Sequence, residues 1–175
     1  SLGKALTKNI VTKWPKIKKI IIFSRDEQKQ FQMAQEFPET LFPQIRFFLG
    51  DVRDQERLIR AFHGVDIVIH AAGYGQPGKF LVNPLTTIEL NTSVTSSLIH
   101  KVNSSGKFLN FSSSEVYSGL GSPPFSENQI GTTNTNHPRS SYIEGKRCGE
   151  AIVSAARQSL SLDANSIRLA LAYGP

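Results

Sequence analysis

Short apolar segments alternate along this chain with longer stretches whose apolar residues recur at helical spacing. β-branched residues fill the short segments, for example Ile20–Ile22 and Ile67–Ile69. Strands are expected at residues 18–24, 45–49, 66–70, 107–111 and 166–170, and helices at 2–13, 27–37, 54–62, 85–102 and 141–158. Asp54 is the expected N-cap of the helix at 54–62, and residues 73–83 are expected to form a loop. This alternation predicts an α/β fold, a doubly wound parallel sheet with helices on both faces and right-handed crossovers.

Polar residues follow the first two expected strands, and ligands bind at the carboxyl ends of strands in such sheets. Ser24 and Arg25 close the first strand, and Asp51 follows the second. A carboxylate at the end of the strand at 18–24 would accept a ribose 2′-hydroxyl, whereas a hydroxyl followed by a guanidinium there can hold a 2′-phosphate. Ser24 and Arg25 therefore favour NADP, but an arginine in a surface turn explains Arg25 equally well, and Asp26 could still reach a ribose.

Tyr142 and Lys146 lie four residues apart in a predicted helix, so they share one face. An alcohol that loses a hydride must also lose a proton, and free tyrosine, with a pKa of about 10, is a poor base. An adjacent ammonium favours the phenolate. Tyr142 is therefore the candidate base, with Lys146 supplying the charge and binding the nicotinamide ribose, while Ser113 binds the reacting hydroxyl. The alternative, a surface Tyr and Lys, is less favoured because hydroxyl-bearing residues end the preceding strand.

Longer motifs in both halves of the chain resemble one enzyme superfamily. The segments SRDE at 24–27, RFFLGDVRD at 46–54 and GVDIVIHAA at 64–72 resemble the inverting nucleotide-sugar 4,6-dehydratases. The motif NP…IE.NT at 83–92, SSSEVYS at 112–118 and PRSSYIEGKR at 138–147 are similar to the UDP-glucuronate decarboxylases and, less closely, to the dTDP-glucose 4,6-dehydratases. The chain is identified by these motifs as a member of the extended short-chain dehydrogenases/reductases, in the NAD-dependent epimerase/dehydratase family.

The resemblance implies a role for each matching position. The implied cofactor-binding residues are Gly3, Ser24, Arg25, Asp51, Val52, Ala71, Ala72, Gly73, Ser112, Tyr142 and Lys146. Asp51 and Val52 would flank the adenine, and the small residues at 71–73 would let the backbone approach the pyrophosphate and ribose. Ser113, Ser114 and Glu115 would bind substrate, and Glu115 would also position it or handle protons near C5.

The implied reaction begins with oxidation of the C4 hydroxyl of a nucleotide-linked sugar, using NAD or NADP. Decarboxylation, epimerisation or dehydration of the 4-keto intermediate follows, in that order of preference. Ser114 stands where the retaining dehydratases carry an acidic Asp, and a hydroxyl is the poorer proton donor. The alternative is a catalytically silent dinucleotide-binding regulator or sensor, against which Ser113, Tyr142 and Lys146 argue.

The ends of the chain bear on its extent. Gly3 matches only the last glycine of the fingerprint G-x-x-G-x-x-G, and no strand precedes it. Residues 168–175 resemble R-x-x-N-x-Y-G-P, with Leu171 in place of the Asn, and are expected beside the nicotinamide. Residues 1–175 are therefore expected to be a fragment of an NAD(P)-binding Rossmann-like domain, truncated because the first strand and the C-terminal substrate domain are absent.

Composition guides the remaining expectations. The net charge is +6, much of it from lysines near the start, but no nucleic-acid motif accompanies it, so a solvated basic surface is favoured over nucleic-acid binding. The lone Cys148 and the lack of a long apolar run suggest a cytoplasmic protein that avoids the membrane. The four histidines match no metal spacing, so no metal is expected.

The two long helices, 85–102 and 141–158, carry apolar residues on more than one face and predict a homodimer.

Overall fold

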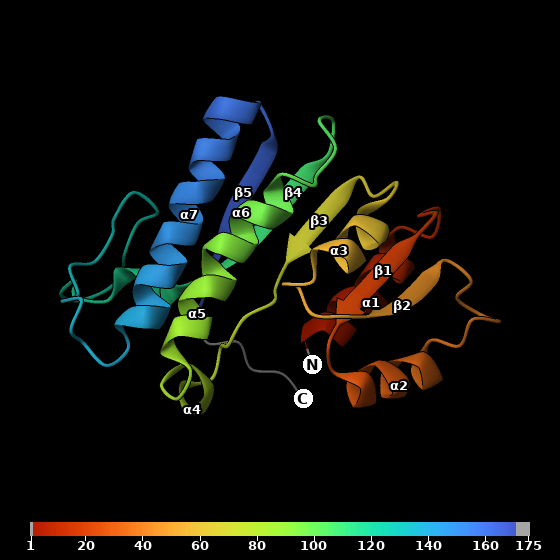
Figure 1. The fold of residues 1–175 in the computed structure, drawn as a ribbon, viewed down its shortest axis with the longest axis horizontal. Helices are drawn as coiled ribbons and strands as arrows, with labels where there is room; N and C mark the ends of the chain where they lie inside the picture. The colour runs from red at the N-terminus through yellow and green to blue at the C-terminus, as the bar shows by residue number, and fades with distance from the viewer. Residues whose placement is uncertain (1, 171–175) are drawn as a thin grey trace. The chain divides into compact units, whose positions relative to one another are not determined.

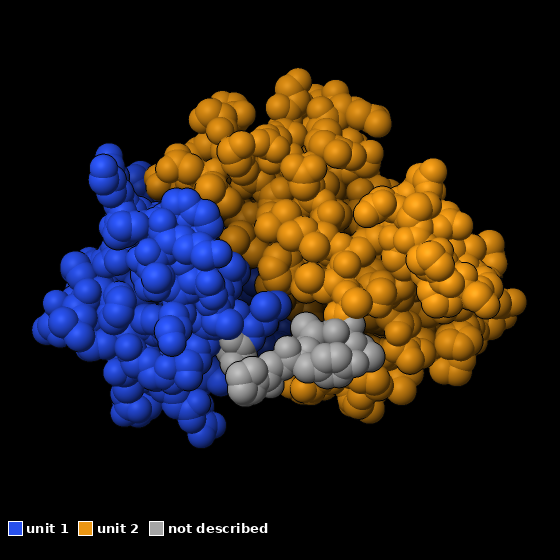
Figure 2. All heavy atoms as spheres, turned by 180° about the vertical axis from the view of Figure 1, so that it is seen from behind, with its two compact units in different colours: residues 1–63 blue, residues 64–175 orange. Residues whose placement is uncertain are grey.

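Parallel strands and the helices between them build residues 2–170, the part of the chain that the computed structural model describes (Figure 1). These residues fall into two units, 1–63 and 64–175, coloured separately in Figure 2. The first unit contains α1 (Leu2–Lys13), β1 (Ile20–Ser24), α2 (Glu27–Glu36), β2 (Ile45–Leu49) and α3 (Gln55–Phe62). The second contains β3 (Ile67–His70), α4 (Pro77–Phe80), α5 (Pro84–Asn91), α6 (Ser93–Ile99), β4 (Lys107–Ser113), the 3-10 helix η1 (Ser114–Tyr117), α7 (Ser140–Leu160) and β5 (Asp163–Leu169).

All described strands pair in parallel, which confirms the predicted α/β fold class. Strands β1 and β2 form one sheet, and β3, β4 and β5 form a second sheet in that order. Within the first unit, Ile20, Phe37 and Ile45 form a small buried core. The pairing is local there, because β1 and β2 are joined by the single crossover helix α2.

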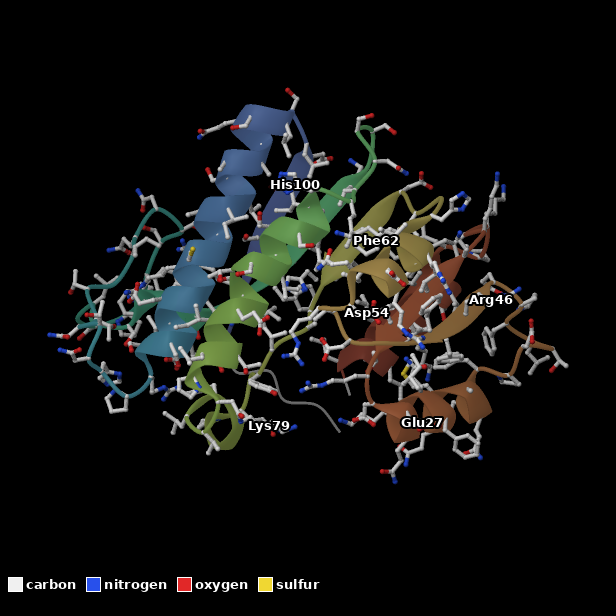
Figure 3. All side chains as sticks on the ribbon, in the orientation of Figure 1. Glu27, Arg46, Asp54, Phe62, Lys79 and His100 are labelled. Atoms are coloured by element: carbon white, nitrogen blue, oxygen red, sulfur yellow. The ribbon has the colours of Figure 1, made fainter. Side chains whose placement is uncertain are left out.

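Two aspartates begin the helices of the first unit. The side chain of Asp26 accepts a hydrogen bond from the Lys29 amide at 3.0 Å, and that of Asp54 accepts one from the Arg57 amide at 3.1 Å. Asp54, labelled in Figure 3, was the predicted N-cap of α3, and this prediction is confirmed. Each cap satisfies an amide that the first helical turn leaves unpaired, so both helices begin directly after a strand end.

In the second unit, helices α5, α6 and α7 lie together over the sheet of β3, β4 and β5 (Figure 1). Alternate residues of β4, namely Phe108, Asn110 and Ser112, are buried, while the residues between them are exposed or only partly buried. Strand side chains alternate between faces, so one face of β4 carries the core of this unit. The end of the strand at Ser113 leads directly into η1.

The predicted continuous helix at 85–102 is wrong, because the chain breaks there into α5 and α6. Thr92 separates them, with φ −117° and ψ −81°. The Asn91 side chain donates to the Thr87 carbonyl at 2.7 Å, and the Thr95 hydroxyl donates to the Asn91 carbonyl at 2.9 Å. Side-chain bonds to the backbone compete in this way with the regular helical ladder. The expected loop at 73–83 also contains a helical turn, α4.

Candidate cofactor and active-site residues

The predicted site residues fall into two groups, one in each unit. Gly3 lies in the first turn of α1, where its carbonyl accepts a hydrogen bond from Thr7 at 2.8 Å. The other residues of the first group follow β1 and β2. Leu171 and the Tyr-Gly-Pro at 173–175 lie outside the described residues.

Arginines surround Asp51 at the end of β2. Arg53 donates two hydrogen bonds to its carboxylate, at 2.9 and 2.8 Å, and Arg25 at the end of β1 lies 3.6 Å away. Hydrogen bonding from Arg53, aided by the charge of Arg25, lowers the pKa of Asp51 to about 2. The two guanidinium groups place donors for an anion at this strand end, and an anionic nucleotide fits such donors.

Gln30 on α2 is a residue that sequence reasoning missed. It is buried, and its Nε2 lies 3.0 Å from the Ser24 carbonyl and 3.1 Å from the Phe48 carbonyl. The Ser24 hydroxyl itself accepts from the Asp26 amide at 3.1 Å. Gln30 therefore joins the ends of β1 and β2, where the predicted adenosine contacts lie. A single polar residue in a helix carries no signal of this role.

In the second unit, the chain after β3 passes through Ala71, Ala72 and Gly73. These residues are exposed or half-buried, so a ligand has access to their backbone. His70, the last residue of β3, is buried, with Nε2 3.3 Å from the Leu90 carbonyl. Burial lowers the pKa of His70 to about 4, which keeps the imidazole neutral near pH 7.

Tyr142 and Lys146 occupy the first two turns of α7. The Lys146 ammonium donates to the Phe111 carbonyl of β4 at 2.7 Å and lies 5.7 Å from the centroid of the Tyr142 ring. Burial lowers the pKa of Lys146 to about 8, and the carboxylate of Glu150 opposes this shift. The helix thus places a cation next to the tyrosine, at the level of the strand end.

The residues after β4 make specific contacts of their own. The Ser113 hydroxyl accepts from the Glu115 amide at 3.3 Å, and the carboxylate of Glu115 pairs with Arg139 at 2.6 Å. Ser114 is exposed at the start of η1. The structure thus places Ser113, Ser114 and Glu115 in one short turn, with Glu115 joined to the N-cap residue of α7.

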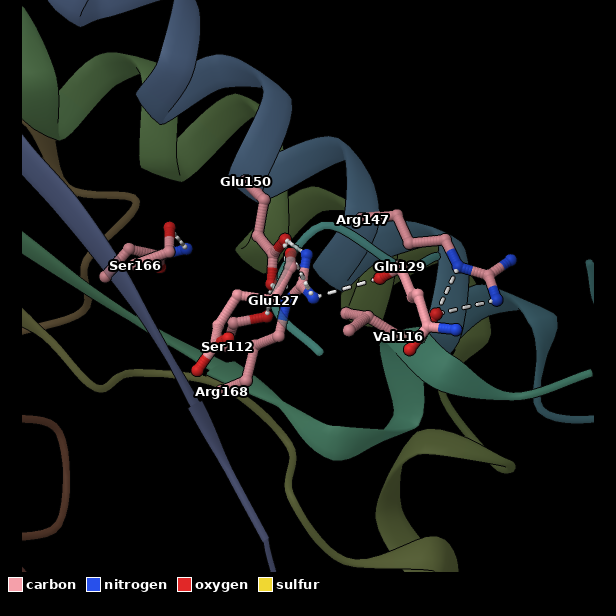
Figure 4. Close-up of polar contacts among 9 residues, drawn as sticks. Ser112, Val116, Glu127, Gln129, Arg147, Glu150, Ser166 and Arg168 are labelled. Carbon is pink, nitrogen blue, oxygen red and sulfur yellow. Dashed lines mark hydrogen bonds and ion pairs between the residues drawn. The ribbon is translucent and has the colours of Figure 1, made fainter. Parts of the chain in front are cut away.

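Ser112 points its hydroxyl into a different network, shown in Figure 4. It donates to Glu150 at 2.5 Å, and Arg168 donates to the same carboxylate through Nε and Nη2 at 2.9 and 2.7 Å. Arg168 also donates to the carbonyls of Glu127 and Gln129, at 2.9 and 3.0 Å. The network connects α7 to the ends of β4 and β5 and to the loop before α7.

Glu150 and Arg168 had no assigned role from the sequence, although a signal existed for both. Glu150 follows Lys146 by four residues, and this spacing puts them on one helix face. Arg168 is the first residue of the C-terminal motif. Neither signal indicates that the two side chains meet, because that contact depends on how α7 packs on β5.

Two negative observations concern the described residues. The His, Cys, Asp and Glu side chains of residues 2–170 form no group of three or more that could hold a metal ion. In the same part of the chain, no helix has both the length and the apolar composition needed to cross a bilayer.

Among known proteins, one family matches the whole chain, and individual relatives match about half of it. The model of the NAD dependent epimerase/dehydratase family matches residues 1–175. The inverting UDP-N-acetylglucosamine 4,6-dehydratase of Campylobacter jejuni (serotype O:2) is 47% identical over 91 residues, which cover 52% of this chain and 26% of that enzyme. The UDP-glucose 4-epimerase of Rickettsia canadensis is 41% identical over 75 residues, 43% of this chain and 21% of that enzyme.

Solved structures agree on the fold. The dTDP-glucose 4,6-dehydratase of Streptomyces venezuelae, solved with NAD bound, superposes with a TM-score of 0.78 at 22% identity. The superposition covers 95% of this chain and 51% of that one. The chain therefore has the fold of the nucleotide-binding enzymes it matches, and it spans about half the length of this solved enzyme and matches about a quarter of each curated relative.

Proposed function

The chain belongs to the NAD dependent epimerase/dehydratase family, and from this premise we propose that its protein oxidises the C4 hydroxyl of a nucleotide-linked sugar with Tyr142 as the base. The observation that carries the proposal is the arrangement of Tyr142 and Lys146 on α7, with the Lys146 ammonium anchored to the Phe111 carbonyl. A bound NAD(P) supplies the hydride acceptor. Curated relatives named for UDP-sugars support a nucleotide sugar as the substrate class.

Tyr142 would take the proton of the reacting hydroxyl. An ammonium beside a phenol stabilises the phenolate, and the Lys146 ammonium lies 5.7 Å from the ring centroid. Tyr142 is buried and Lys146 is partly buried, so the ammonium would act on a phenolate through little water. Ser113, at the end of β4, would hydrogen-bond the same sugar hydroxyl and hold it toward Tyr142.

The fate of the 4-keto sugar depends on the turn at Ser113–Glu115. Expelling a hydroxyl calls for a proton donor, and the exposed Ser114 hydroxyl is a poor one, which disfavours dehydration. Decarboxylation needs no such acid, because a 4-keto uronic acid is a β-keto acid, and epimerisation needs none either. We rank decarboxylation first, then epimerisation, then dehydration, with Glu115 held by Arg139 to position the sugar near C5.

The cofactor residues divide between the two units. Ser24, Arg25, Asp51 and Val52 would hold the adenosine half, Gly3 and residues 71–73 the pyrophosphate and adjoining ribose, and Ser112, Tyr142 and Lys146 the nicotinamide half. Ser24 followed by the Arg25 guanidinium, at the end of β1, supports NADP over NAD. Tighter binding of NAD than of NADP, measured by calorimetry, would contradict this preference.

The proposal extends to the setting of the protein. We propose that residues 1–175 form part of one NAD(P)-binding Rossmann-like domain, and that the protein is a cytoplasmic homodimer. The single cysteine, Cys148, supports a reducing compartment. The exposed apolar residues Leu85 and Ile88 on α5 support the dimer.

The test uses a protein that contains this chain in full, incubated with UDP-glucuronate, UDP-N-acetylglucosamine, UDP-glucose and dTDP-glucose in turn. A product lighter by about 44 mass units indicates decarboxylation, one lighter by about 18 indicates dehydration, and an isomer of unchanged mass indicates epimerisation. Tyr142→Phe should abolish turnover and leave dinucleotide binding intact. Full dinucleotide binding without turnover of any sugar would favour the regulator or sensor instead.

A further inference from the structure

The ring of Tyr142 is held by an aromatic partner from a separate segment. Phe80 is the last residue of α4, a helical turn inside the segment 73–83 that was expected to be loop. Its ring lies parallel to the Tyr142 ring, with centroids 4.7 Å apart and an interplanar angle of 13°. Phe80 is 1% exposed and Tyr142 is 8% exposed, so protein surrounds the stacked pair.

Two cations contact this pair. The Arg139 guanidinium lies 5.5 Å from the centroid of the Phe80 ring, and the Lys146 ammonium lies 5.7 Å from that of Tyr142. Arg139 also donates to Glu115 at 2.6 Å. Arg139, Tyr142 and Lys146 follow one another at spacings of three and four residues, and therefore share one face at the start of α7.

The first side-chain torsion of a tyrosine sets where its phenolic oxygen lies, because that oxygen is on the axis of the second torsion. The second torsion rotates the ring plane and so sets the directions in which the phenolic oxygen can accept a proton. Proton transfer requires the two oxygens to be within hydrogen-bond reach, and small displacements of a catalytic group are costly in rate. A flat aromatic partner limits tilting of the ring, because tilting forfeits the stacking contact.

We propose that Phe80 is a positioning residue for Tyr142: its stacked ring resists tilting of the tyrosine and fixes the ring plane, so that the lone pairs of the phenolic oxygen point at the sugar hydroxyl. The inference rests on the proposed function of Tyr142. Arg139 extends the same arrangement, since its guanidinium contacts Phe80 and binds Glu115. The turn at Ser113–Glu115 and the base are thereby held by one connected set of contacts.

The test compares Phe80→Leu with Phe108→Leu in the protein that contains this chain. Phe108 is an equally buried phenylalanine, 1% exposed, on β4, and it contacts His70 rather than Tyr142. Both changes remove a ring from the core, so both are expected to lower stability to a similar degree. Only Phe80→Leu should lower kcat, by about tenfold or more, with KM and the dinucleotide Kd within about twofold of wild type.

A second readout does not depend on turnover. Selectively labelled tyrosine followed by NMR should show slow flipping of the Tyr142 ring in the wild type and in Phe108→Leu, and fast flipping in Phe80→Leu. Phe80→Met, which keeps most of the volume without a ring, serves if the leucine variant does not fold. Equal kcat and equal flipping in the Phe80 and Phe108 variants would refute the role of Phe80. Activity that survives Tyr142→Phe would instead refute the proposed base.

Discussion

His70 is a buried titratable group whose charge state is set by its surroundings. It ends β3, with its ring nitrogen 3.3 Å from the Leu90 carbonyl and its ring tilted against Phe108. Burial lowers its pKa from 6.5 to about 4, and the Lys146 charge acts in the same direction. We interpret His70 as a structural residue that stays neutral beside the lysine of the proposed site.

This burial predicts a pH dependence of stability. The unfolded chain takes up a proton at His70 near pH 6.5, whereas the folded chain does so only near pH 4. The free energy of unfolding should therefore fall as the pH drops from about 6.5 to about 4, by up to about 3 kcal/mol from this residue. Urea unfolding across this range, compared between wild type and His70→Gln, measures the contribution.

The control for His70→Gln is His63→Gln, because His63 is exposed. Its removal should leave the slope of stability against pH unchanged. If His70→Gln and wild type lose stability in parallel on acidification, the prediction that the buried His70 imidazole stays neutral is wrong. Other groups then account for the acid sensitivity.

At the residue scale, the sequence indicated where the site residues lie in helices and strands better than it indicated which side chains they contact. It placed Tyr142 and Lys146 on one helix face, and the structure has both on α7. It grouped Ser112 with the cofactor residues but gave no sign that the Ser112 hydroxyl donates to Glu150. Side chains of successive strand residues point to opposite faces, so Ser112 and Ser113 have different surroundings. The motif alone does not distinguish the two faces.

Among the secondary-structure elements, α5 and α7 approach each other closely at two glycines. A Cβ added at Gly149 would lie 2.8 Å from the Asn91 carbonyl oxygen, and one added at Gly145 would lie 3.3 Å from the Asn91 Cβ. The close approach coincides with the break between α5 and α6 at Thr92. Gly145 and Gly149 on α7 therefore let α5 pack closely against α7, one to two turns after the proposed base.

Alanine substitutions at Gly149 and Gly145 should differ in their effect on stability. Gly149→Ala should destabilise the protein by about 1–2 kcal/mol, because overpacking against a backbone oxygen outweighs the helix propensity of alanine. Gly145→Ala, whose new methyl group would meet only side-chain atoms of Asn91, at 3.3 Å or more, should cost less. Denaturant midpoints at constant m-value measure both. A Gly149→Ala variant as stable as wild type would show that α5 and α7 can separate freely.

The break in the predicted helix also shows the limit of periodicity. Apolar spacing over residues 85–102 is helical throughout, and most of that segment is helical in the structure. The interruption lies at Thr92, next to the place where Gly149 of α7 comes close to the Asn91 carbonyl. Hydrophobic periodicity reports which face is buried, but it does not report where a neighbouring helix comes close enough to favour a break.

At the scale of the whole molecule, exposed apolar residues on α5 and just before it bear on assembly. Leu85 of α5 is 81% exposed, Ile88 of α5 is also exposed, and so are Leu81 and Val82, which precede the helix. On α7, Cys148, Ala151 and Ala155 are exposed small residues. Large exposed apolar side chains close together in sequence are typical of an interface, and these two helices were the predicted dimer contacts.

The homodimer proposal predicts that Leu85→Glu weakens association. A charge placed at the centre of an apolar interface is desolvated without a partner, so light scattering should show a larger monomer fraction than in the wild type. Leu41→Glu is the matched control, because Leu41 is 73% exposed in the first unit and lies outside α5 and α7. Unchanged dimer in both variants, or a strictly monomeric wild type, would contradict the proposed interface.

The amino-acid sequence determined the fold class, the order of the strands, the N-cap at Asp54 and the pairing of Tyr142 with Lys146 on one face. Each of these depends on residues within a few positions of one another, where helical and strand periodicity act directly. The family also followed from contiguous motifs, and the match over residues 1–175 confirms it.

The tertiary structure alone decided which distant side chains meet. The stack of Phe80 on Tyr142, the bonds of Glu150 to Ser112 and Arg168, and the contact of Arg139 with Glu115 join segments far apart in the chain. The low pKa of His70 likewise comes from burial by neighbouring elements. Such contacts depend on how whole helices pack on the sheet, and local spacing carries no record of that packing.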